Sequence, residues 1–156
     1  MTTIVVMAIT GAGLITGLLF AFSNCVLRAL ADLPNDKGMF AMQRVNEKIQ
    51  NPLFLFLFLG TPILCAVIAF VTARQLAAPD GLLLFTGALA YLVGPFGITV
   101  LFNVPLNNRL AAADRPDADA VWPAYQKQWQ RWNHARTYIG VVAVILLAAG
   151  LAAGDG

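Results

Sequence analysis

The sequence WNHARTYIGVVAVILLAAGLAAG occupies residues 132–154, and no charged side chain follows Arg136 until Asp155. A helix needs about 20 apolar residues to cross about 30 Å of hydrocarbon. The segment therefore predicts a membrane-spanning helix that begins within WNHART, before the charge-free part.

The rest of the chain repeats this pattern. Residues 1–27, 49–73 and 81–108 also lack charged side chains. Only 12% of the 156 residues are charged and 59% are hydrophobic, whereas soluble domains contain roughly a quarter charged residues. Strand-type alternation is absent, and backbone polar groups in a bilayer must pair internally. We expect one all-α domain over residues 1–156, an integral membrane up-down four-helix bundle. The expected spans are residues 4–27, 52–73, 82–104 and 135–153.

The basic residues predict how the bundle sits in the membrane. All of them except Arg74 lie between the first and second spans or between the third and fourth. Cytoplasmic loops are enriched in Lys and Arg. We therefore expect both long loops in the cytoplasm and both termini outside. The first span lacks the basic n-region of a signal peptide, and a net charge of +2 without a basic run does not predict nucleic-acid binding.

Both cytoplasmic loops are expected to contain short amphipathic helices. In the first, Met39, Met42, Asn46 and Ile49 share one helical face. In the second, residues 114–123 are loop-like and lead into a helix with a stripe at helical spacing. The stripe is formed by Trp122, Tyr125, Trp129, Trp132 and Arg136. Two interpretations remain open, namely an interfacial aromatic belt and the roof of a pocket.

Polar side chains concentrate where the four spans meet the long loops. In an up-down bundle these ends are neighbours, so we expect one shared site. The candidate residues are Asn24, Arg28, Asn46, Gln50, Asn103, Asn107, Trp129, Trp132, Asn133, His134 and Arg136. The alternative is that such groups cap helices or meet lipid headgroups.

Helical spacing places these residues on particular faces. Gly13 and Gly17 form a G-x-x-x-G pattern that allows close helix approach, and Asn24 and Arg28 continue the same stripe. We therefore expect this stripe to face protein.

The start of the fourth span has two polar faces. Asn133 and Arg136 share one stripe, whereas His134 aligns with Tyr138 on another. His134 and Arg136 can share a pocket only if the helix is bent or if neighbouring segments approach from two sides.

The residue types limit the chemistry. No carboxylate lies within a span, which disfavours a proton relay or cation pathway. One histidine without clustered cysteines or carboxylates is a poor metal set, so no cofactor is predicted, although a haem with one axial histidine or a single metal remains an alternative. The Arg, Asn, Gln and Trp donors suit an electron-rich oxygen of a phenolate, enolate or quinone. Expected kinks at Pro62 and Pro95 provide room for a flat apolar molecule.

The segments VNEKIQNPLF, FNVPLNN and WNHART resemble those of the anthrone-oxygenase-like family of small four-span membrane proteins. The likeness covers nearly the whole chain, and FNVPLN followed by W-x-x-W-N-H-x-R is fairly specific. The order and spacing fit bacterial members, so we expect a bacterial inner-membrane protein. Some fungal members, which differ around this motif, oxidise an anthrone with O₂ to an anthraquinone.

The resemblance implies an oxygenase that forms a substrate carbanion and needs no obligatory cofactor. It implies His134 as the base, Arg136, Asn133 and Asn103 as oxyanion donors, and Trp129 as a stacking wall; Asn107 also matches the motif. The alternative is a non-enzymatic quinone- or lipid-binding protein, or an assembly subunit that packs through G-x-x-x-G. The expected partners are an apolar aromatic molecule or quinone and membrane lipid, with a homo-oligomer as a further option and no nucleic acid.

Overall fold

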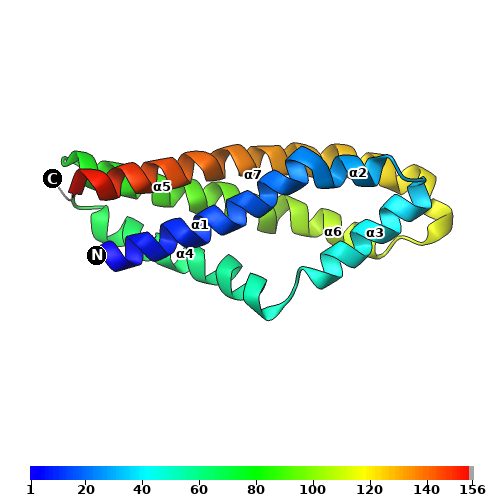
Figure 1. Ribbon diagram of the computed structural model, residues 1–156, viewed down its shortest axis with the longest axis horizontal. Coiled ribbons are helices and arrows are strands. Elements are labelled where there is room, and N and C mark those ends of the chain that lie inside the picture. The colour runs from blue at the N-terminus through cyan, green and yellow to red at the C-terminus, as the bar shows by residue number, and fades with distance from the viewer. Residues whose placement is uncertain (155–156) are drawn as a thin grey trace.

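The computed structural model describes residues 1–154, which form helices joined by short turns (Figure 1). The elements are α1 (Thr2–Ala21), the π-helical η1 (Phe22–Val26), α2 (Leu27–Ala31), α3 (Asn35–Lys48), α4 (Pro52–Thr72), α5 (Pro79–Tyr91), the π-helical η2 (Leu92–Asn103), α6 (Val104–Ala111), the 3-10 helix η3 (Arg115–Asp117) and α7 (Ala118–Gly154). Four segments are long and apolar enough to cross a membrane, namely Thr2–Ala31, Pro52–Thr72, Pro79–Ala111 and Arg115–Gly154. The predicted all-α membrane fold is therefore confirmed.

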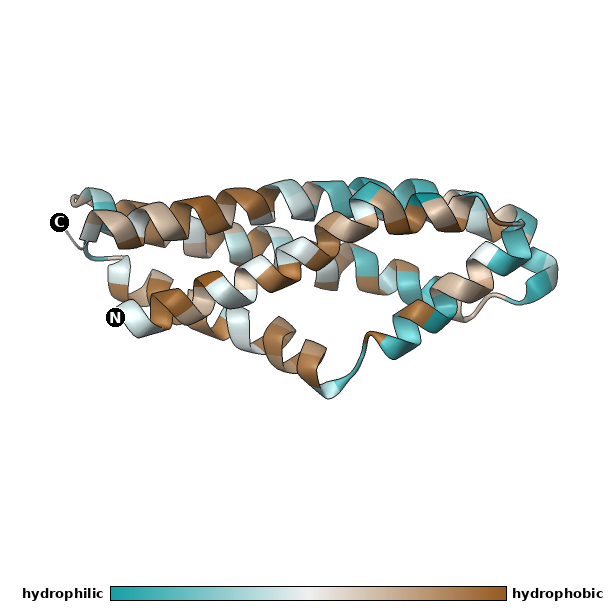
Figure 2. Ribbon diagram, viewed as in Figure 1, coloured by the Kyte–Doolittle hydropathy of each residue, from teal (hydrophilic) through white to brown (hydrophobic). Residues whose placement is uncertain are grey.

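The spanning helices form a closed ring in which each packs against two neighbours. α1 contacts α4 and α7, and α5 contacts the same two helices from the other side. Both termini lie at one end of the bundle, and the two long loops lie at the other (Figure 1). Hydrophobic residues dominate the end with the termini, whereas hydrophilic residues gather on α3, α6 and the first half of α7 (Figure 2). The side of the membrane that this polar end occupies stays a prediction.

Gly140 brings α7 close to α1 and η2. A Cβ atom on Gly140 would lie 2.6 Å from Oγ1 of Thr16 and 3.0 Å from Cγ of Pro95. Because only glycine permits such an approach, α7 packs directly against α1 and η2 at this level. Arg136 lies one turn earlier on α7, so this contact brings it beside η2.

Pro95 accounts for the π-helical stretch in the third span. A proline lacks the N–H that would bond to the carbonyl four residues back, and its ring clashes with that carbonyl. The wider π-helical register avoids the clash, and such stretches are frequent at functional sites. Thr99 follows one turn later and donates from its hydroxyl to the Pro95 carbonyl. The distortion at Pro95 thus fixes the position of Thr99.

The polar end has a hydrophobic core of its own, built by α3, α6 and α7. Met42, Leu110 and Trp122 are completely buried there, and Tyr125 and Trp129 are almost so. An interfacial belt would expose these rings to headgroups, so that interpretation is wrong for these three aromatic residues. Of the residues predicted to share one face of the first-loop helix, Met39 and Met42 are buried, and Asn46 and Ile49 are half-buried.

The second long loop differs from the expectation. Its amphipathic segment is not a separate short helix, because α7 runs unbroken from Ala118 to Gly154. At 1.5 Å per residue these 37 residues extend over about 56 Å, well beyond the hydrocarbon thickness. One rigid helix therefore carries both the aromatic stripe and the membrane span.

The expected burial of the G-x-x-x-G stripe is wrong. A Cβ atom on Gly13 or Gly17 would meet no heavy atom within 4 Å, and Asn24 and Arg28 are exposed. The close approach of α1 to α4 uses Gly11 instead, which lies against Thr61. Helical spacing identified the stripe correctly but could not tell which face of α1 the other helices cover.

Candidate functional site

Arg136 is the central charged group of the site, and only 5% of it is exposed. Its Nε and Nη2 atoms donate to Oδ1 of Asn133 at 3.0 and 2.7 Å. Its Nη1 donates to Oγ1 of Thr99 at 2.8 Å. The guanidinium also lies over the ring of Trp129, 5.1 Å from the ring centre. These contacts from α7 and η2 hold the guanidinium plane in one orientation.

The charge of Arg136 has no carboxylate partner among residues 1–154. The ion pairs found there join side chains of α3 only, and those side chains are all well exposed. A guanidinium has five N–H donors, and the three hydrogen bonds above leave two of them for a ligand. Burying an unpaired charge costs several kcal/mol. An electron-rich ligand oxygen would supply both the missing acceptor and the missing negative charge.

These donors border a cavity of about 240 Å³, here called the Arg136 cavity. All four spanning segments and α3 contribute to its walls. Its apolar walls include Leu18, Phe22, Phe54, Phe58 and Val104, and its polar lining includes Asn46, Gln50, Thr99, Asn107, Asn108, Trp129 and Arg136. The space is small by the standard of ligand pockets, which are roughly 300–1,000 Å³. It suits a compact molecule.

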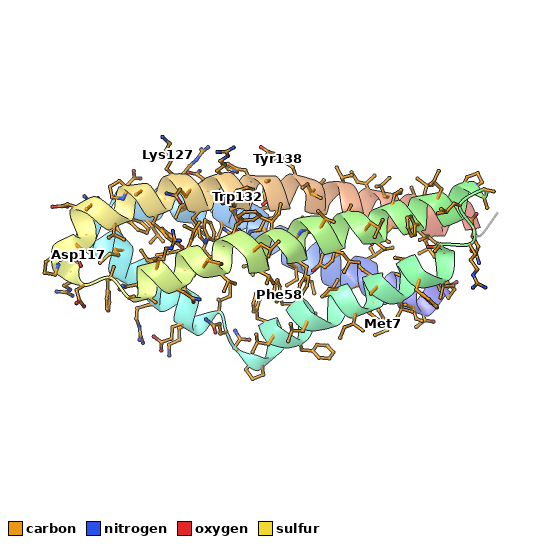
Figure 3. The ribbon with its side chains drawn as sticks, turned by 180° about the vertical axis from the view of Figure 1, so that it is seen from behind. Met7, Phe58, Asp117, Lys127, Trp132 and Tyr138 are labelled. Carbon is orange, nitrogen blue, oxygen red and sulfur yellow. The ribbon has the colours of Figure 1, made fainter. Side chains whose placement is uncertain are left out.

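Aromatic side chains form one wall of the Arg136 cavity. The rings of Phe54 and Phe58 stack at 5.5 Å with an interplanar angle of 11°. Phe58 also meets Phe96 of η2 at 5.5 Å, and Figure 3 shows Phe58 on the inner side of α4. Aromatic rings in the lining of a cavity favour a flat aromatic ligand.

The opposite wall presents N–H donors. Oδ1 of Asn107 accepts from the Tyr125 hydroxyl and from Nε1 of Trp129, each at 2.9 Å. Both donors need that oxygen, so the amide nitrogen of Asn107 is the atom left for the cavity. Nδ2 of Asn46 is buried without a hydrogen-bond partner among the described residues. With Arg136, these amides make a wall that can bind ligand oxygen atoms.

Two neighbouring hollows share residues with the Arg136 cavity. The first, here called the α1–α4 groove, has about 260 Å³ and is lined mainly by leucine and isoleucine side chains. It shares Leu18, Ile49 and Phe54 with the cavity. The second, here called the loop-side cavity, has about 520 Å³ and contains Arg44 and Glu47. It shares Asn46, Gln50, Asn107 and Asn108 with the Arg136 cavity. The central space thus borders an apolar hollow on one side and a polar hollow on the other.

His134 lies on the other side of α7. It lines a separate cavity of about 160 Å³, here called the His134 cavity, together with Phe20, Ser23, Asn24, Arg28, Thr137 and Tyr138. Its Nδ1 atom is 3.0 Å from Oγ of Ser23, and its ring stacks on that of Tyr138 at 6.2 Å. The prediction that an unbent helix separates His134 from Arg136 is confirmed. No group of three or more His, Cys, Asp or Glu side chains able to hold a metal occurs within residues 1–154.

The expected single site is therefore divided. Asn46, Gln50, Asn107 and Trp129 lie with Arg136. The structure places Asn24 and Arg28 with His134 instead.

The remaining candidates line neither cavity. Asn103 is 1% exposed, and its Nδ2 donates to the Trp129 carbonyl at 3.3 Å. Asn133 accepts hydrogen bonds from Arg136 and does not line the cavity itself. Trp132 stacks on Phe102 of η2 with ring centres 3.8 Å apart. These placements give Asn103, Asn133 and Trp132 supporting positions rather than direct access to a ligand.

Sequence reasoning missed two hydroxyl groups and the aromatic wall. Ser23 accepts from Nδ2 of Asn133 at 2.7 Å, and Thr99 accepts from Arg136. Ser23 has no polar neighbour three or four residues away, whereas Thr99 precedes Asn103 by four residues, a spacing that could have pointed to Thr99. The spacing of Phe54 and Phe58, one turn apart beside an expected kink, was the available signal for the wall.

Comparison with known proteins gives one match. The family model described as anthrone oxygenase matches residues 54–146. This range contains Phe54 and Phe58, the π-helical segment, and the polar residues of α6 and α7 that meet at the Arg136 cavity. No curated protein and no solved structure matches the chain significantly.

Proposed function

The chain belongs to the anthrone oxygenase family, and from this we propose that it oxidises a phenolic or anthrone-like aromatic with O₂ to a quinone inside the membrane. The observation that supports this most is the buried guanidinium of Arg136, which has two N–H donors for a ligand and borders an aromatic-walled cavity. Donors fixed before the reaction stabilise an oxyanion most where water is excluded.

The proposed reaction begins with loss of a proton from the methylene carbon of the anthrone. The resulting carbanion is in resonance with a phenolate, whose oxygen accepts from Arg136 and from the amide of Asn107. Trp129 and the Phe54–Phe58 pair enclose the rings. Stabilising the anion in this way favours deprotonation of the carbon and raises the amount of electron-rich substrate available to O₂.

The remaining steps use only the substrate and O₂. The carbanion transfers an electron to O₂, the two radicals combine in a C–O bond, and the peroxide oxygen takes up a proton. Loss of water, which removes the second methylene proton and the terminal O–H, leaves the new carbonyl. One oxygen atom enters the quinone and the other leaves as water, so a methylene and O₂ give a carbonyl and water without an external reductant.

The proton acceptor differs from the one first expected. No histidine or carboxylate lines the Arg136 cavity, and His134 faces the other cavity. We propose that the first proton passes to water on the side of the loop-side cavity, where polar side chains adjoin the site. His134 then acts on Arg136 only indirectly, through Ser23 and Asn133.

The two neighbouring hollows suit this chemistry. An apolar substrate dissolved in the bilayer reaches the cavity through the α1–α4 groove. Protons and water exchange through the loop-side cavity. The apolar substrate and the polar products, water and protons, therefore use different openings of the cavity.

The test is oxidation of an anthrone by the full-length protein in lipid nanodiscs under air, followed by quinone absorbance and O₂ uptake. Arg136→Gln is expected to lower kcat/KM about 100-fold, the usual effect of losing an oxyanion donor. Arg109→Gln removes a cation from exposed surface and serves as the matched control. An Arg136→Gln variant that keeps the wild-type rate above spontaneous oxidation would refute the proposal.

The absence of a histidine or carboxylate from the lining favours a second candidate, a quinone-binding protein without turnover. In that case the same donors hold a quinone carbonyl. The protein would then bind an anthraquinone with a dissociation constant that rises in Arg136→Gln, while anthrone oxidation would not exceed the rate in empty nanodiscs.

A further inference from the structure

The His134 cavity lies where the apolar part of the bundle ends. Arg28 is the first charged side chain of the chain, and Arg136 is the last before Asp155. Between the two helices that carry them, Asn24 and His134 line the His134 cavity together with Arg28. The polar groups of this cavity therefore lie at the level where a bilayer changes from hydrocarbon to headgroups.

The cavity offers donors without a neutralising acid. Arg28 is exposed and takes part in no ion pair among residues 1–154. Nδ1 of His134 is engaged by Ser23, which leaves Nε2 for a ligand. The amide of Asn24 supplies a further N–H group, and no carboxylate belongs to the lining. A guanidinium, an imidazole and an amide around one hollow match the oxygen atoms of a phosphate.

An apolar surface continues from this cavity into the membrane. Phe20 and Tyr138, which flank it, are 55% and 69% exposed, and Figure 3 shows Tyr138 on the outer side of α7. The exposed stripe of Gly13 and Gly17 continues along the same face of α1, and the space over both glycines is open. The surface over both glycines is thus unobstructed beside the polar groups.

We propose that this surface binds an anionic phospholipid, with its phosphate at Arg28, Asn24 and His134 and one acyl chain along Gly13 and Gly17. Basic pockets at the cytoplasmic ends of transmembrane helices bind anionic headgroups, and the predicted orientation puts this end in the cytoplasm. The site is separate from the Arg136 cavity and does not rest on the proposed oxygenase activity.

A second copy of the chain fits the same surface less well. A symmetric pair of α1 helices that cross at Gly13 and Gly17 would place the same patch of each chain together. In a parallel arrangement the two Arg28 side chains would approach one another on that shared stripe, and like charges at an interface are unfavourable. The phosphate of a lipid would neutralise the charge of Arg28, whereas a second copy of the chain would bring another positive charge close to it.

The experiment titrates the purified full-length protein with phosphatidylglycerol and counts retained lipids by native mass spectrometry. Arg28→Gln is expected to weaken retention about tenfold, the effect of losing a hydrogen bond to a charged group. His134→Gln is expected to weaken it in the same direction. Arg109→Gln, which removes an exposed cation outside the cavity, should retain lipid as the wild type does. Gly17→Leu should also reduce retention, because the leucine side chain would occupy the open surface over Gly17.

Each other outcome overturns the proposal. Equal retention by Arg28→Gln and Arg109→Gln would mean that charge at the cavity does not matter. Competition by inorganic phosphate without retained phosphatidylglycerol would identify a free anion rather than a lipid. A dimer that is lost in Gly17→Leu, with unchanged lipid retention, would assign the glycine stripe to a second copy of the chain.

Discussion

A single oxygen of Asn133 accepts two hydrogen bonds from Arg136, from Nε at 3.0 Å and from Nη2 at 2.7 Å. The amide nitrogen of Asn133 donates to the Leu19 carbonyl at 2.9 Å and to Oγ of Ser23 at 2.7 Å. Turning the amide over would sacrifice all of these contacts. Asn133 is thus the neutral group that orients a buried cation without cancelling its charge.

Asn133→Asp tests the need for that neutrality. The carboxylate would pair with Arg136 and compete with any ligand oxyanion, so anthrone turnover should fall about 100-fold, while the helix content measured by circular dichroism stays unchanged. Gln128→Glu adds the same charge to an exposed position of α7 and should have no effect. Wild-type turnover in Asn133→Asp would show that the charge of Arg136 is not used.

His134→Ala separates a direct base from a supporting residue. Because His134 reaches Arg136 only through Ser23 and Asn133, the variant should keep turnover within about fivefold of wild type, the effect of one neutral hydrogen bond. Its rate profile between about pH 5 and 8 should have the wild-type shape. If the wild-type rate changes with pH in that range and the rate of His134→Ala does not, His134 is the base.

Much of the fold and part of the site could be predicted because the signals are local. Long charge-free stretches identify membrane helices wherever they pack. Helical spacing within α7 alone separates Arg136 from His134, and in the structure the two residues line different cavities. The expected second span begins at residue 52, and α4 begins at Pro52, where Oδ1 of Asn51 accepts from the Phe54 N–H at 3.1 Å.

The rest depended on how helices rotate against one another. Gly13 and Gly17 form a recognisable stripe, but whether it faces a helix or the lipid is decided by contacts elsewhere, such as Gly11 against Thr61. Thr99 reaches Arg136 from a π-helical segment, whose register differs from the α-helical spacing used to read faces. Convergence of helix ends was visible in the sequence, but which residues of the other spans lie with His134 and which lie with Arg136 was not.

A pair of variants at Asn107 distinguishes support of the fold from binding. Asn107→Leu removes the acceptor of Tyr125 and Trp129, and each orphaned donor should cost about 1–3 kcal/mol, so the thermal midpoint in detergent should fall. Asn107→Asp keeps an oxygen acceptor and should unfold near the wild-type temperature. It nevertheless places negative charge beside the Arg136 cavity, so its affinity for a phenolate ligand should fall. Equal unfolding midpoints for the two variants would contradict the role of Asn107 as the hydrogen-bond acceptor of Tyr125 and Trp129.

Two glycine substitutions test the packing of α7. Gly140→Ala would press a methyl group against Thr16 and Pro95, and overpacking of this kind typically costs about 1–3 kcal/mol. Gly17→Ala meets open space and should be neutral or stabilising by up to about 1 kcal/mol through helix propensity. The free energy of unfolding in mixed micelles should therefore fall in Gly140→Ala and stay unchanged or rise in Gly17→Ala. A stable Gly140→Ala protein would mean that α7 does not approach α1 and η2 this closely.

Leu18→Trp tests the proposed route from the bilayer. Leu18 borders both the α1–α4 groove and the Arg136 cavity, so an indole at this position narrows the junction between them. Oxidation of an apolar anthrone in nanodiscs should slow at low substrate concentration. A sulfonated anthrone, which stays out of hydrocarbon and arrives through the loop-side cavity, should be oxidised as by the wild type. Leu89→Trp on the exposed face of α5 is the matched control. If Leu18→Trp slows both substrates equally, the groove is not the way in.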